Sequence, residues 1–376
     1  MRILVLGPDH TGGSLPPYLD ALSAGLRQHG ATVDRHGSVG VPYDRKRQEF
    51  QPIGDIAAQA DALLDRIDLG DYDVLSVHFG NLEVEQLLPV LWAGRPHPPA
   101  VYHVHTLAPT LLRDHVPDPQ WYSAVRKEIR RFDGYVYFGQ HARAHLAGTV
   151  SEGAPSGMAW LPTTIPDKTE PRMRPELAAA LDTDGIPVIS LYGYAAPWKD
   201  AALLYAAARL MDIPARIVLA GDFWTDPAQA GIDLGHTTTP VRLGAAEFVI
   251  VPGYLGPSDR IGLARASRAA VFPYRAHPSF QGSGAIADYL AHAVPVVATD
   301  VANMAELVAD AGRIVPAGDA HALARALDTV AANGVAASRY IRRAQAYAHR
   351  FSAGAHAGRC LDVYRRVSEH QQRRIV

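Results

Sequence analysis

The sequence predicts an α/β protein built from two Rossmann-like, doubly wound domains that face a cleft. Short apolar runs alternate with longer stretches of helical periodicity, which is typical of parallel strands joined by crossover helices. The alternation stops between residues 151 and 175, where Pro, Gly, Thr and Ser predominate, and then starts again. The length of 376 residues fits two domains at roughly 150 residues or more each. Ligands of such sheets bind beyond the carboxyl ends of the strands.

The first predicted domain spans residues 1–170. Its buried strands are expected at 2–6, 73–78, 100–106 and 134–138. A helix with leucines on one face follows the first strand, and an amphipathic helix at 121–132 precedes the fourth. The basic face of the second helix would also suit a membrane surface. Because a strand follows this helix directly, we interpret it as a crossover helix.

The second predicted domain spans residues 171–350, and residues 351–376 form a C-terminal helix. Strands are expected at 187–192, 215–220, 247–251, 269–273 and 294–299. Helices are expected at 200–211, 260–267, 284–292 and 320–332, and over much of 338–376.

Composition excludes several classes of protein. The 36 basic and 38 acidic residues nearly cancel, so no overall positive field attracts nucleic acid or anionic lipid. The single cysteine, Cys360, forms no intrachain disulfide and excludes a metal site made of cysteines alone. The longest stretch without charged residues, 96–112, contains four prolines and is no membrane helix. We expect a cytoplasmic protein without stable membrane insertion.

A Gly-Ser-Gly turn opens one of the predicted helices. Gly282, Ser283 and Gly284 follow the strand at 269–273 and precede the helix at 284–292. Such a turn exposes backbone N–H groups at the positive end of a helix dipole, which suits a diphosphate. The alternative is a plain β–α turn in which the glycines only allow the backbone to turn tightly.

The segment 271–319 resembles the donor-binding half of the GT-B glycosyltransferases of family 4, the glycosyl transferases group 1. That family has a Glu-Gly-x-Gly loop, a second Glu eight positions later, and then Gly-x-Pro-Val-Val-Ala. Here Gln281 stands in place of the first Glu, and Asp288 stands for the second with one residue fewer between them. The run 312–319 continues the resemblance.

A second match lies at residues 192–200. It is similar to the family's strand followed by Gly-Arg and, further on, Lys-Gly, in which Lys and Arg hold the donor diphosphate. Gly193 and Lys199 keep the pattern, whereas Tyr194 replaces the Arg and Asp200 the Gly. In the first domain, Gly12-Gly13 resembles the first glycine loop, and His105 occupies the position of a histidine that faces the donor sugar in many relatives. The C-terminal helix resembles one that crosses back to the first domain.

The resemblance implies a retaining, metal-independent glycosyltransferase that uses a nucleotide-diphosphate sugar and no cofactor. Lys199 and the N–H groups of residues 282–285, including Ala285, would hold the diphosphate. Asp288 would bind the ribose, and Gln281 and His105 would lie at the sugar. Glu306 would contact the nucleotide or merely cap its own short helix. The acceptor, a small molecule or glycan, would enter near Gly12-Gly13 and His78, in a monomer or homodimer.

Each of these residues also has a purely structural interpretation. A lysine at a helix start is disfavoured by the helix dipole, so Lys199 is better explained by a bound anion. His105 is either a buried, hydrogen-bonded histidine or a contact to the donor sugar. His103 and His105 share a strand face, but no third metal ligand has suitable spacing. The Asp-x-Asp triplets at 71–73 and 182–184 precede strands, away from the expected ligand edge, and we expect no divalent metal.

Gln281 and Tyr194 also leave a different class of function open. Without the family's Glu and Arg, the chain would be a catalytically weakened scaffold that binds a nucleotide sugar. An epimerase of the same architecture would need acid and base residues that the sequence does not reveal.

Overall fold

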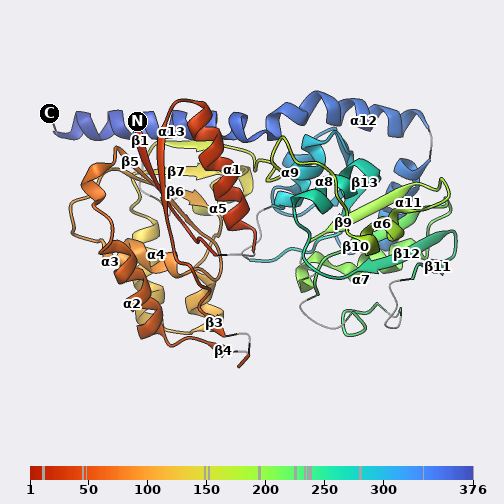
Figure 1. Cartoon of the computed structure of the whole chain (residues 1–376), viewed down its shortest axis with the longest axis horizontal. Coiled ribbons are helices and arrows are strands. Elements are labelled where there is room, and N and C mark those ends of the chain that lie inside the picture. Colours follow the sequence, from red (N-terminus) through yellow and green to blue (C-terminus); the bar gives the residue numbers. More distant parts are fainter. Residues whose placement is uncertain are drawn as a thin grey trace. The chain divides into compact units, whose positions relative to one another are not determined.

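The computed structural model divides the chain into two compact α/β units. It describes residues 1–10, 13–44, 46–47, 49–147, 150, 153–193, 196–223, 227–232, 234, 239–278, 282–332 and 334–375. Unit 1 contains Met1–Leu161, Pro278–Gln281 and Ala353–Val376, and unit 2 contains Pro162–His277 and Gly282–Ser352. The helix expected at the C-terminus therefore belongs to the same unit as the N-terminal strands (Figure 1).

Unit 1 is built on a six-stranded parallel sheet with the strand order β2-β1-β5-β6-β7-β8. Its strands are β1 (Arg2–Leu6), β2 (Thr32–His36), β5 (Val74–Phe79), β6 (Ala100–Val104), β7 (Gly134–Tyr137) and β8 (Ser156–Met158). Its helices are α1 (Leu15–Gln28), α2 (Ile53–Leu64), α3 (Leu88–Leu91), α4 (Pro119–Ile129), α5 (Gln140–Leu146) and α13 (Ala353–Ile375). A short antiparallel pair, β3 (Tyr43–Asp44) and β4 (Glu49–Phe50), lies outside this sheet.

Helices cover both faces of the first sheet, so alternate residues of each strand enter different cores. Ile3 and Val5 of β1 pack with α1 and α13, whereas Leu4 and Leu6 pack with α2, α3 and α4. All residues of β5 are buried, as expected for a central parallel strand. Figure 1 shows α1 and α13 lying side by side.

Two glycines allow α13 to approach the sheet closely. A Cβ on Gly134 would lie 2.4 Å from a methyl group of Val367, and one on Gly157 would lie 2.5 Å from a methyl group of Val363. The absence of side chains at these strand positions thus creates the surface on which the C-terminal helix packs.

Unit 2 is built on a seven-stranded sheet with the order β11-β12-β10-β9-β13-β14-β15, in which only β11 is antiparallel to its neighbour. Its strands are β9 (Val188–Tyr192), β10 (Arg216–Ala220), β11 (Val241–Leu243), β12 (Ala246–Val251), β13 (Ser267–Phe272), β14 (Val296–Thr299) and β15 (Gly312–Val315). Its helices are α6 (Pro175–Leu181), α7 (Ala201–Ala208), α8 (Pro257–Ala266), α9 (Gly284–Ala291), α10 (Met304–Val308), α11 (Ala320–Ala331) and α12 (Val335–Tyr347).

The predicted α/β class and the clear apolar strands are confirmed, but one interpretation was wrong. The stretch 151–175, expected as a connection, contains β8, which pairs with β7 and completes the first sheet. Its short sequence, Ser-Gly-Met, has too little apolar character to signal a strand. The triplets at 71–73 and 182–184 do precede strands, β5 and β9.

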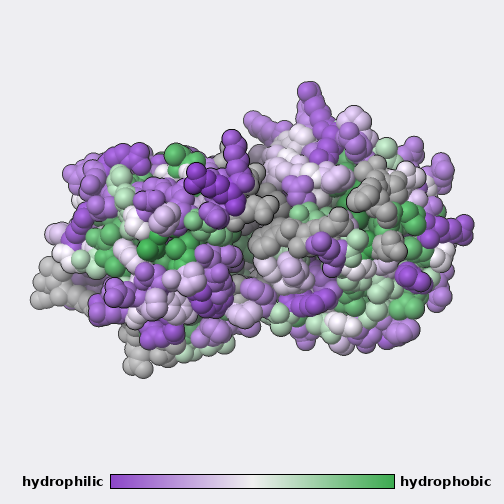
Figure 2. All heavy atoms as spheres, turned by 90° about the horizontal axis from the view of Figure 1, so that it is seen from below, coloured by the Kyte–Doolittle hydropathy of each residue, from purple (hydrophilic) through white to green (hydrophobic). Residues whose placement is uncertain are grey.

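No helix in the described part of the chain is long and apolar enough to cross a bilayer. On the face drawn in Figure 2, polar and charged side chains cover much of each unit, with apolar patches between them.

Candidate active site

The carboxyl ends of four parallel strands of unit 2 meet at one edge of the sheet. The strands β9, β10, β13 and β14 all run in the same direction, so the loops that follow them are neighbours. Hydrogen bonds join these loops: the Gly193 N–H donates to the Ala220 carbonyl at 2.9 Å, and the Thr299 hydroxyl donates to the Tyr274 carbonyl at 2.6 Å.

Glycine is required where two of these loops touch. Gly221 has a φ of +141°, and a Cβ there would lie 2.1 Å from the carbonyl oxygen of Gly193. Gly193 itself has a φ of +115°, and a Cβ there would lie 2.9 Å from the Lys199 Nζ. Both glycines therefore leave room at the place where the lysine ends.

Lys199 is a half-buried cation at this edge. Its Nζ lies 5.7 Å from the centre of the Tyr274 ring, and no carboxylate of the described residues forms an ion pair with it. Burial lowers the pKa of Lys199 from its ordinary 10.5 to about 8. A charge desolvated in this way is stabilised by a bound anion.

Arg275 places a second cation beside Lys199. Its Nε and Nη2 donate to the two carboxylate oxygens of Asp200 at 2.6 and 2.8 Å, and its backbone N–H donates to the Trp198 carbonyl at 2.7 Å. Asp200 is almost fully buried, while the side chain of Arg275 is 60% exposed. The loop of Arg275 is thus fixed to the loop of Lys199, and its guanidinium remains accessible.

The first turn of α9 also lies at this edge. Ser283 is the N-cap residue, but its side chain accepts no bond from the helix backbone, and its Oγ lies 3.4 Å from the Tyr274 hydroxyl. A Cβ on Gly284 would meet nothing within 4 Å, so the helix starts in open space. The Tyr274 ring therefore connects the Lys199 ammonium to the start of α9, where backbone N–H groups lack partners within the helix.

Asp288 lies beneath this edge, in a closed ionic cluster. Its Oδ1 accepts bonds from the Thr163 hydroxyl at 2.7 Å and the Thr164 N–H at 2.8 Å. Its Oδ2 accepts from the Tyr192 hydroxyl and from the Arg260 Nη1, the latter at 2.7 Å. Since the side chain is only 1% exposed, four donors saturate a carboxylate that solvent does not reach.

A cluster of histidines lies in unit 1 at the carboxyl end of β6. His105 is half-buried, its Nε2 lies 3.2 Å from the His78 Nδ1, and its ring packs edge-on against Tyr18. Burial lowers the pKa of His105 to about 3, so its ring is neutral at pH 7. Gly13, near the N-terminal end of α1, has a φ of +78°.

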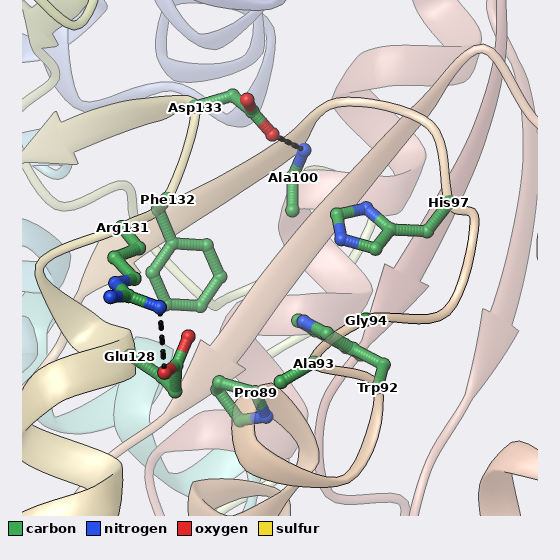
Figure 3. A pocket seen from close by; sticks show the side chains of 10 residues that line it. All are labelled: Pro89, Trp92, Ala93, Gly94, His97, Ala100, Glu128, Arg131, Phe132 and Asp133. Carbon is green, nitrogen blue, oxygen red and sulfur yellow. Dashed lines mark hydrogen bonds and ion pairs between the residues drawn. The ribbon is translucent and has the colours of Figure 1, made fainter.

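A small cavity lies at the opposite edge of the first sheet. It has a volume of about 260 Å³, and Figure 3 shows Trp92, His97 and Phe132 among its lining residues. Ala100 and Asp133, at the amino ends of β6 and β7, also line it. It is therefore remote from His105 within the same unit, and we assign it no part in the site.

Comparison with known proteins places these features in a family. Residues 174–333 match the model of the glycosyl transferases group 1. Over 312 residues the chain is 30% identical to a phosphatidyl-myo-inositol mannosyltransferase of Mycolicibacterium smegmatis, a match that covers 80% of this chain and 72% of that protein. The chain belongs to the group 1 glycosyltransferases.

Solved structures agree on the fold of this glycosyltransferase. Sucrose-phosphate synthase from Thermosynechococcus elongatus superposes with a TM-score of 0.69 at 16% identity, covering 98% of this chain and 99% of that one. Anabaena HepE in complex with UDP and glucose superposes with a TM-score of 0.66 at 15% identity, covering 96% and 98%. The glycosyltransferase therefore has the predicted GT-B architecture.

The glycosyltransferase brings together part of the site predicted from its sequence. Gly193, Lys199 and the turn of Gly282, Ser283, Gly284 and Ala285 all lie at the carboxyl edge of the second sheet. Glu306 is half-buried in the first turn of α10. His105 lies in unit 1. Gly12, Tyr194 and Gln281 lie outside the described residues.

The carboxylate of Asp288, which is predicted to bind the ribose, already has hydrogen-bond partners within the folded chain. The groups that donate to this carboxylate belong to Thr163, Thr164, Tyr192 and Arg260. A ribose diol would have to displace one of these donors from a buried ion pair, which is costly. The ribose contact of Asp288 stays a prediction.

Sequence reasoning missed Arg275 and Tyr274. Both lie in the loop after β13, behind Pro273, at a strand end where ligands of such folds bind. Their position after an apolar strand was a usable signal.

Proposed function

We propose that this glycosyltransferase transfers a sugar from a nucleotide-diphosphate donor whose diphosphate lies against Lys199 and the first turn of α9. The supporting observation is the arrangement of Lys199, Tyr274 and Ser283, which joins an unpaired, desolvated ammonium to an uncapped helix N-terminus. Both features favour the same ligand, because each stabilises negative charge.

The same groups would assist the reaction. Negative charge grows on the leaving nucleoside diphosphate as its bond to the anomeric carbon breaks. Donors and charges fixed in advance at that place stabilise the transition state more than the ground state. We assign this role to the Lys199 Nζ and to the N–H groups of Gly284 and Ala285.

Arg275 would supply a second positive charge for the diphosphate. The family has an arginine where this chain has Tyr194, and Arg275 places a guanidinium beside Lys199 from another loop. Its bidentate bond to Asp200 fixes its direction, while its exposure leaves other N–H groups for a ligand.

We propose further that the reaction is metal-independent and retains the configuration of the sugar. The Lys199 ammonium offers a positive charge to the phosphate, the exposed guanidinium of Arg275 offers further N–H donors, and Asp200 and Asp288 are engaged by arginines. The proposal of retention rests on the resemblance to family 4. Gln281 and His105 are the candidates for contact with the sugar, and Glu306 for contact with the nucleotide. The acceptor is a small molecule or a glycan that binds near Gly13 and His78.

A thermal-shift screen with nucleoside diphosphates and nucleotide sugars, carried out in EDTA, tests the binding mode. A ligand at about 100 times its Kd stabilises the folded state by about 2.7 kcal/mol. We expect at least one nucleotide-diphosphate sugar to raise the melting temperature of the wild type, but not of Lys199→Ala. No shift with any donor, or an equal shift in both proteins, would contradict the proposal.

Incubation of the active donor with candidate acceptors then tests transfer. Proton NMR of the product gives the configuration at the anomeric carbon. An inverted product, or activity that is lost in EDTA and restored by Mg²⁺, would refute the corresponding part of the proposal.

A further inference from the structure

Unit 1 contains a buried hydrogen-bonded network that ends at His105. We call it the histidine–tyrosine network; its members are His356, Tyr18, His103, Tyr364, Ser76, His78 and His105. All except the half-buried His105 are at most 4% exposed. They come from α1, α13, β5 and the end of β6.

The direction of the network is set at its buried end. The Nδ1 of His356 lies 2.8 Å from the Trp160 carbonyl oxygen. A carbonyl only accepts, so Nδ1 carries the proton of this neutral ring and Nε2 presents a lone pair. That lone pair lies 2.9 Å from the Tyr18 hydroxyl, which therefore donates to it.

The proton positions on His103 and Tyr364 follow from that of Tyr18. Because the Tyr18 proton is used, its oxygen accepts from the His103 Nδ1–H at 2.9 Å. The His103 Nε2 is then an acceptor and receives the proton of the Tyr364 hydroxyl at 2.7 Å.

The remaining contacts are also determined. The Tyr364 oxygen accepts from the Ser76 hydroxyl at 2.6 Å, and the Ser76 oxygen accepts from the His78 Nε2–H at 2.7 Å. The His78 Nδ1 then accepts from the His105 Nε2–H at 3.2 Å. Any other assignment leaves one of these close contacts between two lone pairs, without a proton.

The geometry points to a positioning role for this network. We propose that it fixes His105 as the Nε2–H tautomer and presents the Nδ1 lone pair as a hydrogen-bond acceptor for a hydroxyl of the bound sugar or acceptor. Tyr18, Ser76, His78, His103, Tyr364 and His356 act as positioning residues. The hydroxyl contact rests on the proposed function, whereas the tautomer does not.

The ring charges agree with this assignment. Burial lowers the pKa of His356 to about 4 and that of His105 to about 3, and it lowers the pKa values of His78 and His103 well below their ordinary value. All four rings are neutral at pH 7, so each carries one N–H and one lone pair. Because the network ends on a carbonyl, it cannot carry a proton away, and it orients His105 rather than relaying protons.

The hydrogen bonds of the network oppose metal binding at one group of potential ligand atoms. The ligand atoms of His103, His356 and Cys360 lie within 4.8 Å of one another. However, the His356 Nε2 and His103 Nδ1 both bond to Tyr18, so a metal ion would have to break these two hydrogen bonds.

Two matched tyrosine variants test the proposal. Tyr18→Phe removes the hydroxyl that links His356 to His103. The remaining hydrogen bonds can then adopt either donor–acceptor orientation. Tyr364→Phe removes an equally buried hydroxyl, but Ser76 Oγ lies 3.3 Å from the His103 Nε2 and donates to it directly. The direction is therefore kept in Tyr364→Phe and lost in Tyr18→Phe.

The tautomers are measured by two-bond ¹H–¹⁵N NMR of ¹⁵N-histidine-labelled full-length protein, with His105→Gln to assign the His105 signal. We expect His105 as Nε2–H in the wild type and in Tyr364→Phe, and as a mixture of tautomers in Tyr18→Phe. The Nδ1–H form in the wild type, or an unchanged tautomer in a folded Tyr18→Phe, would overturn the network's direction.

Kinetics test the hydroxyl contact separately. If at most half of the Tyr18→Phe molecules have His105 in the Nε2–H form, the KM for the ligand that Nδ1 binds should rise about twofold or more. An unchanged KM for both substrates, in a variant whose tautomer is mixed, would refute the contact while leaving the tautomer assignment intact. Failure of the proposed function would instead appear as absence of transfer in the wild type.

Discussion

Replacing Lys199 by methionine should make the ligand-free protein more stable and its reaction slower. The burial that lowers the pKa from 10.5 to about 8 disfavours the charged folded state, at 1.36 kcal/mol for each pKa unit. The upper limit is therefore about 3 kcal/mol, and partial exposure reduces it to about 1–3 kcal/mol. Methionine keeps most of the side-chain volume and removes the charge. The free energy of unfolding of Lys199→Met at pH 7 should therefore exceed that of the wild type by about 1–3 kcal/mol.

The pH dependence has a definite sign. Between pH 8 and 10.5 the unfolded state holds more protons on Lys199 than the folded state does, so this group makes the wild type more stable as pH rises. The advantage of Lys199→Met should thus be full below pH 8 and vanish toward pH 10.5. Urea unfolding of both proteins at several pH values isolates this difference from other titrating groups.

Activity is the second half of the prediction. Lys199→Met should lower turnover at least tenfold, and the nucleotide-induced thermal shift should disappear, because the diphosphate loses a charged partner. A variant no more stable than the wild type at pH 7 would refute the argument from charge burial. Unchanged turnover in a folded variant would refute the role in the reaction.

Three further experiments test the packing and the buried charges. Gly221→Ala should cost about 1–3 kcal/mol or more, measured by urea unfolding, because its Cβ would lie 2.1 Å from the Gly193 oxygen at a φ that alanine avoids; a neutral effect would show that the loops yield easily. Arg260→Met should cost about 3–5 kcal/mol by leaving Asp288 unpaired, and adding Asp288→Asn should restore part of the loss; strictly additive losses would argue against the ion pair. Burial raises the pKa of Glu83 to about 7, so its contribution to stability falls as pH rises from 4.5 to 7, and Glu83→Gln should gain on the wild type over that interval; parallel pH curves would contradict this.

The sequence was sufficient where burial on both faces leaves a continuous apolar run. Strands such as Arg2–Leu6 and Val188–Tyr192 were visible for that reason. The edge strand Thr32–His36 escaped prediction because only Val33 is buried in its Thr-Val-Asp-Arg-His sequence. Ser156–Met158 escaped for the same reason.

The candidate site divides along similar lines. Lys199 was found because residues 192–200 resemble the family's lysine-containing motif, and its position just before a predicted helix favoured a bound anion. The closed state of Asp288 depends on Thr163, Tyr192 and Arg260, which no local pattern relates to it. The partners of His105 likewise come from distant parts of the chain.

The position of α13 determines when unit 1 can complete its folding during translation. The sheet face that contains Gly134 and Gly157 is covered by Val363 and Val367 of α13. These two valines are synthesised after the whole of unit 2. Until then the nascent first unit has an uncovered apolar sheet face and an open-ended histidine–tyrosine network. Emerging N-terminal domains usually fold first. Here completion of the N-terminal unit must follow translation of the last helix, so a stalled or truncated chain would present that apolar surface to chaperones and proteases.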